Sequence, residues 1–241
     1  FVWVLFQQFE LSYMWLYTLG GGIAVVIVLF CWNNFPMFHE KVSQTKKVIL
    51  RKRYWLYYAL QFMSGARRQI FVVFAGFLMV EKFEFTVAEI SMLLIANATI
   101  NVFFAPKIGR LIQRFGERKS LIFEYIGLSL IFAGYAFVES SYFAVFLYIA
   151  DHLLFSIAIA LKTYFQKIAD PADIASSAGV SFTINHIAAV FIPVAFGLVW
   201  LHSPSLVFLA GSGMAIVSLI LALNMPSKPA LGNEVLLGKF S

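Results

Sequence analysis

Long apolar stretches follow one another along almost the whole chain, and only short polar segments separate them. The first stretch, residues 1–33, is interrupted by Gln7, Gln8 and Glu10. As one straight helix it would be about 50 Å long. We therefore expect the end of one helix to about residue 9, a short turn, and a second helix from about residue 13 to 33. The later apolar stretches cover about residues 54–80, 87–107, 119–138, 141–166, 173–200 and 204–224.

Each later stretch is long enough to cross a lipid bilayer, since a hydrocarbon core of about 30 Å needs roughly 20 apolar residues in a helix. Short connections make successive helices antiparallel neighbours. The pattern predicts an all-α, polytopic transmembrane helical bundle. We expect four parts: a partial bundle at 1–33, a basic loop at 34–53, a six-helix bundle at 54–226 and a loosely ordered tail at 227–241.

The composition excludes a soluble globular domain. Hydrophobic residues make up 61% of the 241 positions and charged residues only 12%, whereas a soluble domain is typically about a quarter charged. So few polar residues could not cover such an apolar chain with a water-facing surface. The lone Cys31 excludes an intrachain disulfide and a cysteine metal cluster, and we expect neither a cofactor nor a bound metal.

The positive charges are distributed unevenly between the two sides of the predicted bundle. Of the 18 Lys and Arg residues, fifteen lie at alternate connections and in the tail, whereas the opposite connections hold only Lys82. Short basic loops remain cytoplasmic in membrane proteins, so we expect the C-terminus on the cytoplasmic side of a plasma or inner membrane. The net charge of +6 then reflects orientation in the lipid bilayer, and nucleic acid is not an expected partner.

A motif lies between the second and third spans after the basic loop, with the sequence Gly109-Arg110-Leu111-Ile112-Gln113-Arg114-Phe115-Gly116-Glu117-Arg118-Lys119. It resembles the motif between the second and third helices of each half of major facilitator superfamily transporters: a glycine, three residues, an acid, a basic residue, a spacer, a glycine and further basic residues. Gly109, Arg114, Gly116 and Arg118 match, and Gln113 stands where the family has the acid. A tight turn, with glycines at positive φ or in close packing, is one physical interpretation. Simple anchoring of the topology by the cations is the other.

The resemblance covers about residues 13–226 and implies the second half of such a transporter, preceded by the last part of the first half. The chain begins Phe1-Val2-Trp3-Val4 without Met, and we expect it to be a fragment of a longer protein. The resemblance also implies alternating access, in which two bundles rock around a site at the middle of the membrane. The missing N-terminal half would supply the other wall of that site.

Two arginines lie deep in the first span of the six-helix bundle. Arg67 and Arg68 are roughly 20 Å past its cytoplasmic start at the rise of an α-helix. A charge near the bilayer centre costs about 2.5–3.5 kcal/mol on insertion scales, and adjacent side chains point about 100° apart, so at least one should face the bundle interior. We interpret both as groups that recognise an anionic substrate, because a guanidinium presents a fork of donors. A structural ion pair with Asp151 or Glu124 is the alternative.

An acid and two histidines lie at a similar depth in later spans. Asp151 and His152 are roughly 15 Å into a span that starts outside, and His186 is placed similarly in the next span. Because these groups exchange protons, and His titrates near neutrality, we interpret them as the residues that couple transport to a proton gradient. The alternatives are neutralisation of an arginine by Asp151 and simple packing of the histidines.

Three asparagines complete the set of candidate substrate-binding residues. Asn97 and Asn101 are four residues apart and therefore share a helix face, where they would line a cavity or hydrogen-bond a neighbouring helix. Asn185 precedes His186. Glu124 is near the cytoplasmic end of its span, so we expect it to pair with a loop cation, and we expect Lys162 to extend its amino group to the membrane surface.

Together these features predict a secondary active transporter of the major facilitator type, which moves a small anionic solute by alternating access and uses a proton gradient. The sequence contains no P-loop, Gly-x-Ser-x-Gly or His-Glu-x-x-His motif, so we expect neither an ATP-driven pump nor an enzyme. The alternative is a non-transporting scaffold or sensor on the same fold. It predicts that the deep charges pair off completely and leave no water-filled cavity.

Overall fold

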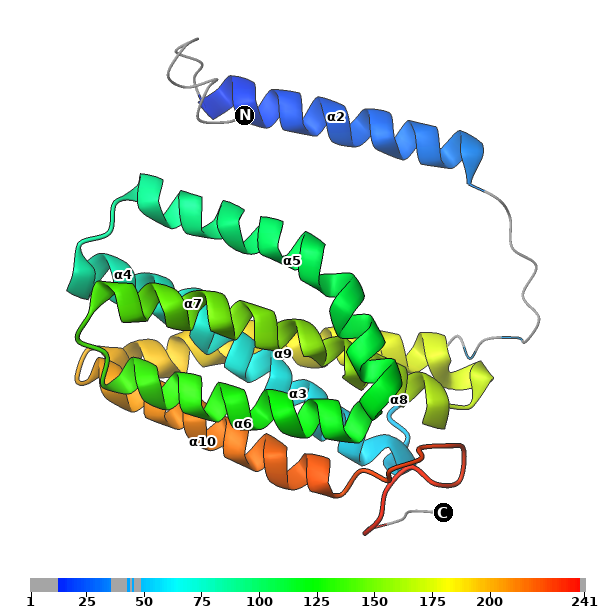
Figure 1. The fold of residues 1–241 in the computed structure, drawn as a ribbon. Coiled ribbons are helices and arrows are strands. Elements are labelled where there is room, and N and C mark those ends of the chain that lie inside the picture. The colour runs from blue at the N-terminus through cyan, green and yellow to red at the C-terminus, as the bar shows by residue number, and fades with distance from the viewer. Residues whose placement is uncertain (1–12, 36–42, 44, 46–48, 239–241) are drawn as a thin grey trace. The chain divides into compact units, whose positions relative to one another are not determined.

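The computed structural model describes residues 13–35, 43, 45 and 49–238, and it separates into two compact units, Phe1–Lys41 and Val42–Ser241. In the first unit the described residues form helix α2, Tyr13–Asn34 (Figure 1). This helix agrees with the one expected from about residue 13 to 33. The helix end and the turn expected before it lie outside the described residues.

The second unit is a bundle of helices joined by short connections (Figure 1). Its α-helices are α3 (Trp55–Gln69), α4 (Gly76–Phe83), α5 (Val87–Phe115), α6 (Glu117–Ala136), α7 (Ser141–Phe155), α8 (Ile159–Ile168), α9 (Ile174–Trp200) and α10 (Pro204–Leu223). Short segments of 3₁₀- or π-helix extend them, namely η1 (Lys52–Tyr54), η2 (Ile70–Ala75), η3 (Ser156–Ala158) and η4 (Pro171–Asp173).

These short segments join neighbouring α-helices into longer helical runs. One run extends from Lys52 to Phe83 through η2, and another from Ser141 to Ile168 through η3. Among the described residues, seven runs are long and apolar enough to cross a membrane, α2 included, and none of these residues forms a β-strand. The predicted all-α bundle is confirmed.

Local chemistry sets the boundary between α4 and α5. Glu84 ends α4 in a left-handed conformation at φ 55°. Thr86 then caps α5: its hydroxyl oxygen accepts a hydrogen bond from the Glu89 N–H at 3.3 Å, and the Glu89 carboxylate accepts one from the Thr86 N–H at 2.8 Å. This reciprocal pair satisfies two amide groups that the start of the helix would otherwise leave unpaired.

Helix α5 is longer than the apolar pattern predicts. We expected the helix to end near residue 107, but α5 continues to Phe115, because Lys and Arg are good helix formers. Figure 1 shows α5 bent along its length, and Pro106 lies inside it, where a missing N–H removes a backbone hydrogen bond. The turn into α6 is the single residue Gly116 at φ 82°, a conformation that glycine adopts without strain.

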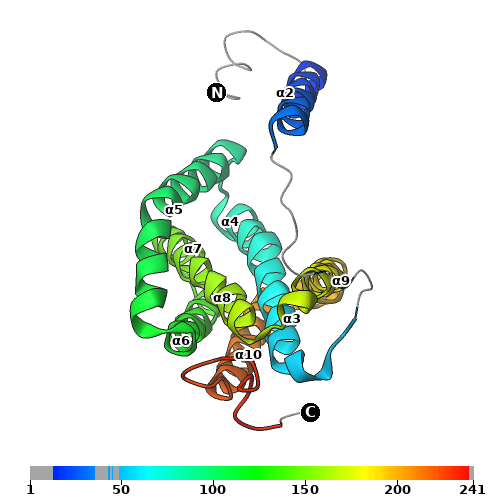
Figure 2. The ribbon, with the colours of Figure 1, turned by 90° about the vertical axis from the view of Figure 1, so that its right-hand side faces the viewer.

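Helix α6 packs against α10, and α3 packs against α9. Figure 2 shows this bundle nearly end on, with α5 along one side and α9 on the other. Small residues allow the close contact between α6 and α10, since a Cβ at Gly211 would stand 2.9 Å from Cδ1 of Phe132.

Buried apolar side chains form two clusters, which follow one another along the helices. The first includes Phe132 and Phe208, and the second includes Leu60 and Tyr125. Buried polar residues lie at the level where the two clusters meet, and each is less than a tenth exposed: Ser64 and Arg67 on α3, Glu124 on α6, Asp151 on α7 and Ser181 on α9. The bundle therefore has a polar layer between two apolar cores.

The expected loose order of the C-terminal tail is wrong for the tail residues that the structure describes. Val235 is only 2% exposed and belongs to the second cluster. The Tyr164 hydroxyl donates to the Glu234 carbonyl, and the Trp55 indole donates to the Gly238 carbonyl at 3.0 Å. The tail folds back on the bundle because its apolar side chain and its backbone carbonyls find partners there.

The end of the basic loop is bound to the turn between α8 and α9. Nη2 of Arg51 lies 3.0 Å from Oδ1 of Asp173, and Nη2 of Arg53 lies 3.3 Å from Oδ2 of the same carboxylate. The hydrogen bond and negative charge of Asp173 raise the pKa of the Arg51 guanidinium above its ordinary value. These contacts attach the end of the expected basic loop to the rest of the second unit.

We expect Gly211→Leu to lower the free energy of unfolding by about 1–3 kcal/mol, the usual cost of overpacking a well-filled contact. The added side chain would collide with Phe132. The measurement is the shift in the unfolding midpoint of the purified protein in detergent. Gly213→Leu on the same helix is the matched control, because a Cβ there would meet nothing within 4 Å. An equal loss of stability in both variants would contradict the close packing of α6 on α10.

Candidate functional site

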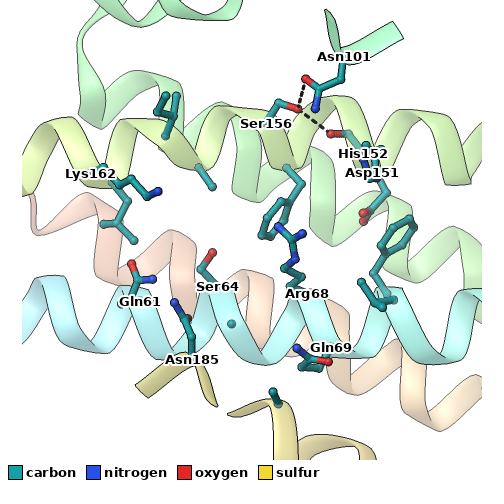
Figure 3. A pocket seen from close by; sticks show the side chains of 18 of the residues that line it. Gln61, Ser64, Arg68, Gln69, Asn101, Asp151, His152, Ser156, Lys162 and Asn185 are labelled. Carbon is teal, nitrogen blue, oxygen red and sulfur yellow. Dashed lines mark hydrogen bonds between the residues drawn. The ribbon is translucent and has the colours of Figure 1, made fainter. Parts of the chain in front are cut away.

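A cavity of about 590 Å³ lies within the second unit, between α3, α5, the run of α7 and α8, and α9. Figure 3 shows side chains from these helices converging on it. Its polar lining consists of Gln61, Ser64, Arg68, Gln69, Asn101, Asp151, His152, Ser156, Lys162, Asn185 and His186. Small-molecule sites typically have this size and combine apolar walls with a few converging polar groups.

The cavity lies at the middle of the long helical runs that surround it. The midpoint of Lys52–Phe83 falls between Arg67 and Arg68, and the midpoint of Pro171–Trp200 falls between Asn185 and His186. Asn101 is the midpoint of α5. In runs long enough to cross a bilayer, these positions are the ones farthest from both membrane surfaces.

Two cations face the cavity. Arg68 and Lys162 are both exposed side chains of its lining, and neither forms an ion pair with a described carboxylate. The guanidinium carbon of Arg68 lies 5.0 Å from the centre of the Phe155 ring. This cation–π contact orients Arg68 and leaves its N–H groups available to a ligand. Lys162, whose amino group we expected to extend to the membrane surface, is also part of the cavity lining.

Asp151 supplies the cavity's carboxylate. Its residue is 2% exposed, yet it is part of the lining, and Figure 3 shows its side chain beside that of His152. Asp151 interacts electrostatically with both Arg67 and Arg68. Asp151 thus interacts with one arginine that lines the cavity, Arg68, and with one that does not, Arg67.

Arg67 lies behind the cavity wall and does not line it. It is 1% exposed, its Nε–H donates to the Met63 carbonyl at 3.2 Å, and its guanidinium carbon lies 4.5 Å from the centre of the Tyr125 ring. Both terminal guanidinium nitrogens lack a hydrogen-bond partner among the described residues. Direct contact between Arg67 and a substrate in the cavity, which the sequence interpretation included, does not follow from this placement.

The candidate residues of α9 line the opposite wall. His186 is exposed, its Nδ1 lies 2.8 Å from the Phe182 carbonyl, and its ring centre is 3.9 Å from that of Phe182. Because a carbonyl only accepts, Nδ1 is the donor and Nε2 is left for a ligand or a proton. Asn185 approaches α3 closely, since a Cβ at Gly65 would stand 2.7 Å from its Oδ1. Gly65 therefore makes room for Asn185 at the cavity.

The two asparagines of α5 have different surroundings. Asn101 lines the cavity, and its Oδ1 accepts a hydrogen bond from the Ser156 hydroxyl at 3.2 Å. Asn97 does not line it: the residue is 2% exposed, and its amide has no hydrogen-bond partner in the described part of the chain. Only Asn101 is positioned to contact a molecule in the cavity.

The chain matches the sequence profile of the Major Facilitator Superfamily over residues 4–193 and again over residues 57–236. Each match covers well over half of the sequence. The chain belongs to the major facilitator superfamily. The resemblance noted in the sequence is confirmed, and the protein is an integral membrane transporter of the major facilitator type, in a family of transporters rather than enzymes. Comparison with curated proteins finds no match to the chain.

The family motif of this major facilitator protein lies outside the cavity lining. Gly116 forms the turn between α5 and α6, whereas Gly109 is neither at positive φ nor in close packing, because it lies inside α5 with open space around it. Arg114 stacks on the Phe115 ring, with its guanidinium carbon 5.6 Å from the ring centre. Arg118 donates to the Leu223 carbonyl at 2.8 Å and so connects the start of α6 to the end of α10.

The surroundings of Glu124 differ from the expected pairing with a loop cation. Glu124 forms no ion pair with a cation among the described residues, and it is 0% exposed, with no hydrogen-bond partner there for either carboxyl oxygen. Its position in the sequence, near the cytoplasmic end of α6, suggested a pairing with a loop cation. Helices α7, α8 and α10 pack on α6 instead, and Glu124 is enclosed in the polar layer.

The sequence interpretation missed several lining residues of the transporter. Gln61 and Ser64 on α3 were missed, although they lie seven and four residues before the predicted Arg68. This spacing places all three on one helix face and was the available signal. Ser156 and Lys162 gave no such signal, because η3 interrupts the regular helix between α7 and α8. Nowhere in the described ranges do three or more His, Cys, Asp or Glu residues gather so that they could hold a metal ion.

We expect a cysteine at position 101, but not at position 97, to react with a charged methanethiosulfonate reagent. Asn101 lines the cavity, whereas Asn97 is enclosed one helical turn away. The variants Asn101→Cys and Asn97→Cys are made with Cys31→Ser, and labelling is counted by the mass of the intact protein. Full labelling of both variants after unfolding is the control. Equal labelling of both in the folded protein would contradict this placement of the cavity.

Proposed function

We propose that this transporter carries a small anionic solute through its mid-membrane cavity and couples that movement to a proton. The observation that supports the proposal is the pair of cations Arg68 and Lys162. Both line the cavity, and no described carboxylate forms an ion pair with either.

An unpaired cation at the centre of a membrane protein, as Arg68 is, is costly and usually serves binding or transport. Here two cations face one carboxylate, Asp151, so the lining has excess positive charge when its histidines are neutral. The planar fork of Arg68 suits a carboxylate, phosphate or sulfonate, and Lys162 adds a point charge from α8. An anion that binds between them would replace the hydration of both groups.

Neutral polar groups in the same lining provide the remaining contacts. Asn101 and Asn185 approach from α5 and α9, on different sides of the cavity, and Gln61 approaches from α3. Amide groups both donate and accept hydrogen bonds, so they would orient the uncharged part of the solute. The volume of about 590 Å³ favours a small metabolite.

The proposed mechanism is alternating access, with the described bundle rocking against a second bundle around this site. We place the basic loop and the tail in the cytoplasm and the protein in a plasma or inner membrane, because the cations are concentrated on that side of the spans. The N-terminal half expected upstream would complete the cavity.

Asp151 is the proposed coupling residue, together with His152 and His186. With Asp151 ionised, its negative charge competes with the solute for Arg68, since the two side chains interact electrostatically. A proton on Asp151 removes that competition and frees Arg68 for the anion. Proton and anion would therefore bind together, which is the requirement for their coupled transport.

We expect Arg68→Gln to abolish the stabilisation of the purified full-length protein by anions, because it removes the charge and the donor fork from the cavity. The measurement is the unfolding temperature against a panel of anionic, neutral and cationic metabolites. A ligand at 100 times its Kd stabilises by about 2.7 kcal/mol. Arg110→Gln is the matched control, since Arg110 is exposed on α5 and outside the cavity lining.

Arg68→Lys should retain part of the anion effect, because it preserves the charge and loses only the fork. If anions stabilise Arg68→Gln as much as the wild type, Arg68 is not the binding group. If only neutral or cationic compounds stabilise the wild type, the anionic substrate class is wrong.

We expect Asp151→Asn to reduce the pH dependence of anion binding to the part that His152 and His186 contribute. In the wild type, binding of a sulfonate should strengthen as the pH falls, because a proton on Asp151 removes a negative charge beside Arg68. Asparagine mimics the protonated acid, so the variant should bind more tightly than the wild type at alkaline pH, where Asp151 of the wild type is ionised. A sulfonate keeps its charge over this range, and its affinity is obtained from thermal shifts at several pH values. A variant with the same pH dependence as the wild type would exclude Asp151 as the coupling residue.

A further inference from the structure

The proposed transport mechanism assigns no role to one buried acid. Glu124, on α6, is 0% exposed, and neither of its carboxyl oxygens has a hydrogen-bond partner among the described residues. A carboxyl group removed from water in this way needs a compensating charge or a proton. The neighbouring groups decide which of the two it receives.

Arg67 is the buried cation that can supply this compensating charge. It reaches from α3 into the polar layer, where its guanidinium stacks on Tyr125, the residue next to Glu124. Glu124 interacts electrostatically with Arg67, which favours its charged form, and with Asp151, which opposes it. Neither acid lies within 4 Å of Arg67, since no such ion pair is formed. Arg67 is therefore committed to neither carboxyl group.

The other elements around Glu124 bring no competing charge. Helix α10, the main neighbour of α6, contains no charged residue. On α8, Lys167 is paired with Glu117 at 2.6 Å and Lys162 lines the cavity. On α5, the residue buried at mid-helix is the neutral Asn97. The charged groups of the enclosed layer are thus Arg67, Glu124 and Asp151.

The groups around Asp151 complete the electrostatic surroundings. Arg68 lies on the cavity side, and the neighbouring His152 lines the cavity too. The phenol groups of Tyr135 and Tyr148 lie near the Asp151 carboxyl group. Both phenols are neutral at physiological pH, so Arg67 and Arg68 are the cations that stabilise ionised Asp151.

We propose that Glu124 is a positioning residue for the coupling proton: it competes with Asp151 for Arg67 and so keeps Asp151 able to accept a proton from the cavity. The inference rests on the proposed role of Asp151. If Glu124 were absent, Arg67 would interact with Asp151 alone and would stabilise the ionised form of Asp151. With Glu124 present, a proton on Asp151 releases Arg67 to Glu124, and the buried guanidinium keeps a counter-charge in both states.

This arrangement connects the cavity to the interior of the bundle. Asp151 lies on the wall, Arg67 behind it, and Glu124 on α6. A change of protonation at the wall therefore changes the attraction between α3 and α6. Glu124 contacts neither the solute nor the cavity, so its effect on coupling acts through Arg67.

The test is infrared difference spectroscopy of the full-length protein over a pH titration, which reports protonated carboxyl groups without any substrate. The Asp151 signal is identified by its loss in Asp151→Asn. We expect Glu124→Gln to move the midpoint of that signal to lower pH by about 1 unit, the smaller end of the effect of a nearby charge. Glu117→Gln is the matched control, because Glu117 is on the same helix and 5% exposed but is paired with Lys167.

An unchanged midpoint in Glu124→Gln, or an equal shift in Glu117→Gln, would overturn the proposal. If Glu124→Gln does not fold, Asp151→Asn gives the second test. There the carboxyl signal that remains from Glu124 should weaken at a given pH, since Arg67 then serves Glu124 alone, and an unchanged signal would show that the two acids do not compete. Because no anion is present, failure here is distinct from failure of the anion-binding proposal, which the thermal shifts test.

Discussion

An arginine and two carboxyl groups are enclosed together where the two apolar clusters of the bundle meet. Removing each ion from water costs several kcal/mol, which a nearby opposite charge or, for a carboxyl group, a proton offsets. The helices that carry Arg67, Glu124 and Asp151 must therefore keep their relative register. A slip of one turn, about 5.4 Å, would separate the charges and leave at least one of them uncompensated.

The cavity follows from the same constraint. Adjacent residues of a helix point about 100° apart, so with Arg67 directed into the polar layer, Arg68 points to the other side of the wall. On that side, polar residues from the middle of α5, α7 and α9 line the cavity with Arg68. The π-helical segment η2 begins directly after Gln69, and such segments are frequent at functional sites. One pair of neighbouring arginines thus supplies both a charge in the buried polar layer and a charge in the cavity lining, where we propose that the anion binds.

Contacts outside the polar layer stabilise the end of the bundle that carries the basic loop and the tail. Asp173 holds the two arginines before α3, Arg118 connects α6 to α10, and the tail lies against Trp55 and Tyr164. These contacts favour movement of the bundle as one body, as the proposed rocking of one bundle against another requires. Flexibility within the bundle would instead disperse the polar layer on which the cavity depends.

The sequence by itself determined the number and the approximate positions of the spans, because apolar runs of membrane length depend on local composition alone. It also predicted the family and the depth of Arg67, Arg68, Asp151 and His186, since depth follows from counting residues along a helix. Only the tertiary structure decided which of two adjacent arginines faces the cavity and which of Asn97 and Asn101 is enclosed. It also decided that Glu124 lies in the polar layer and that the tail is ordered. These outcomes depend on the rotation of each helix about its axis and on its neighbours, and a pattern along one helix does not contain that information.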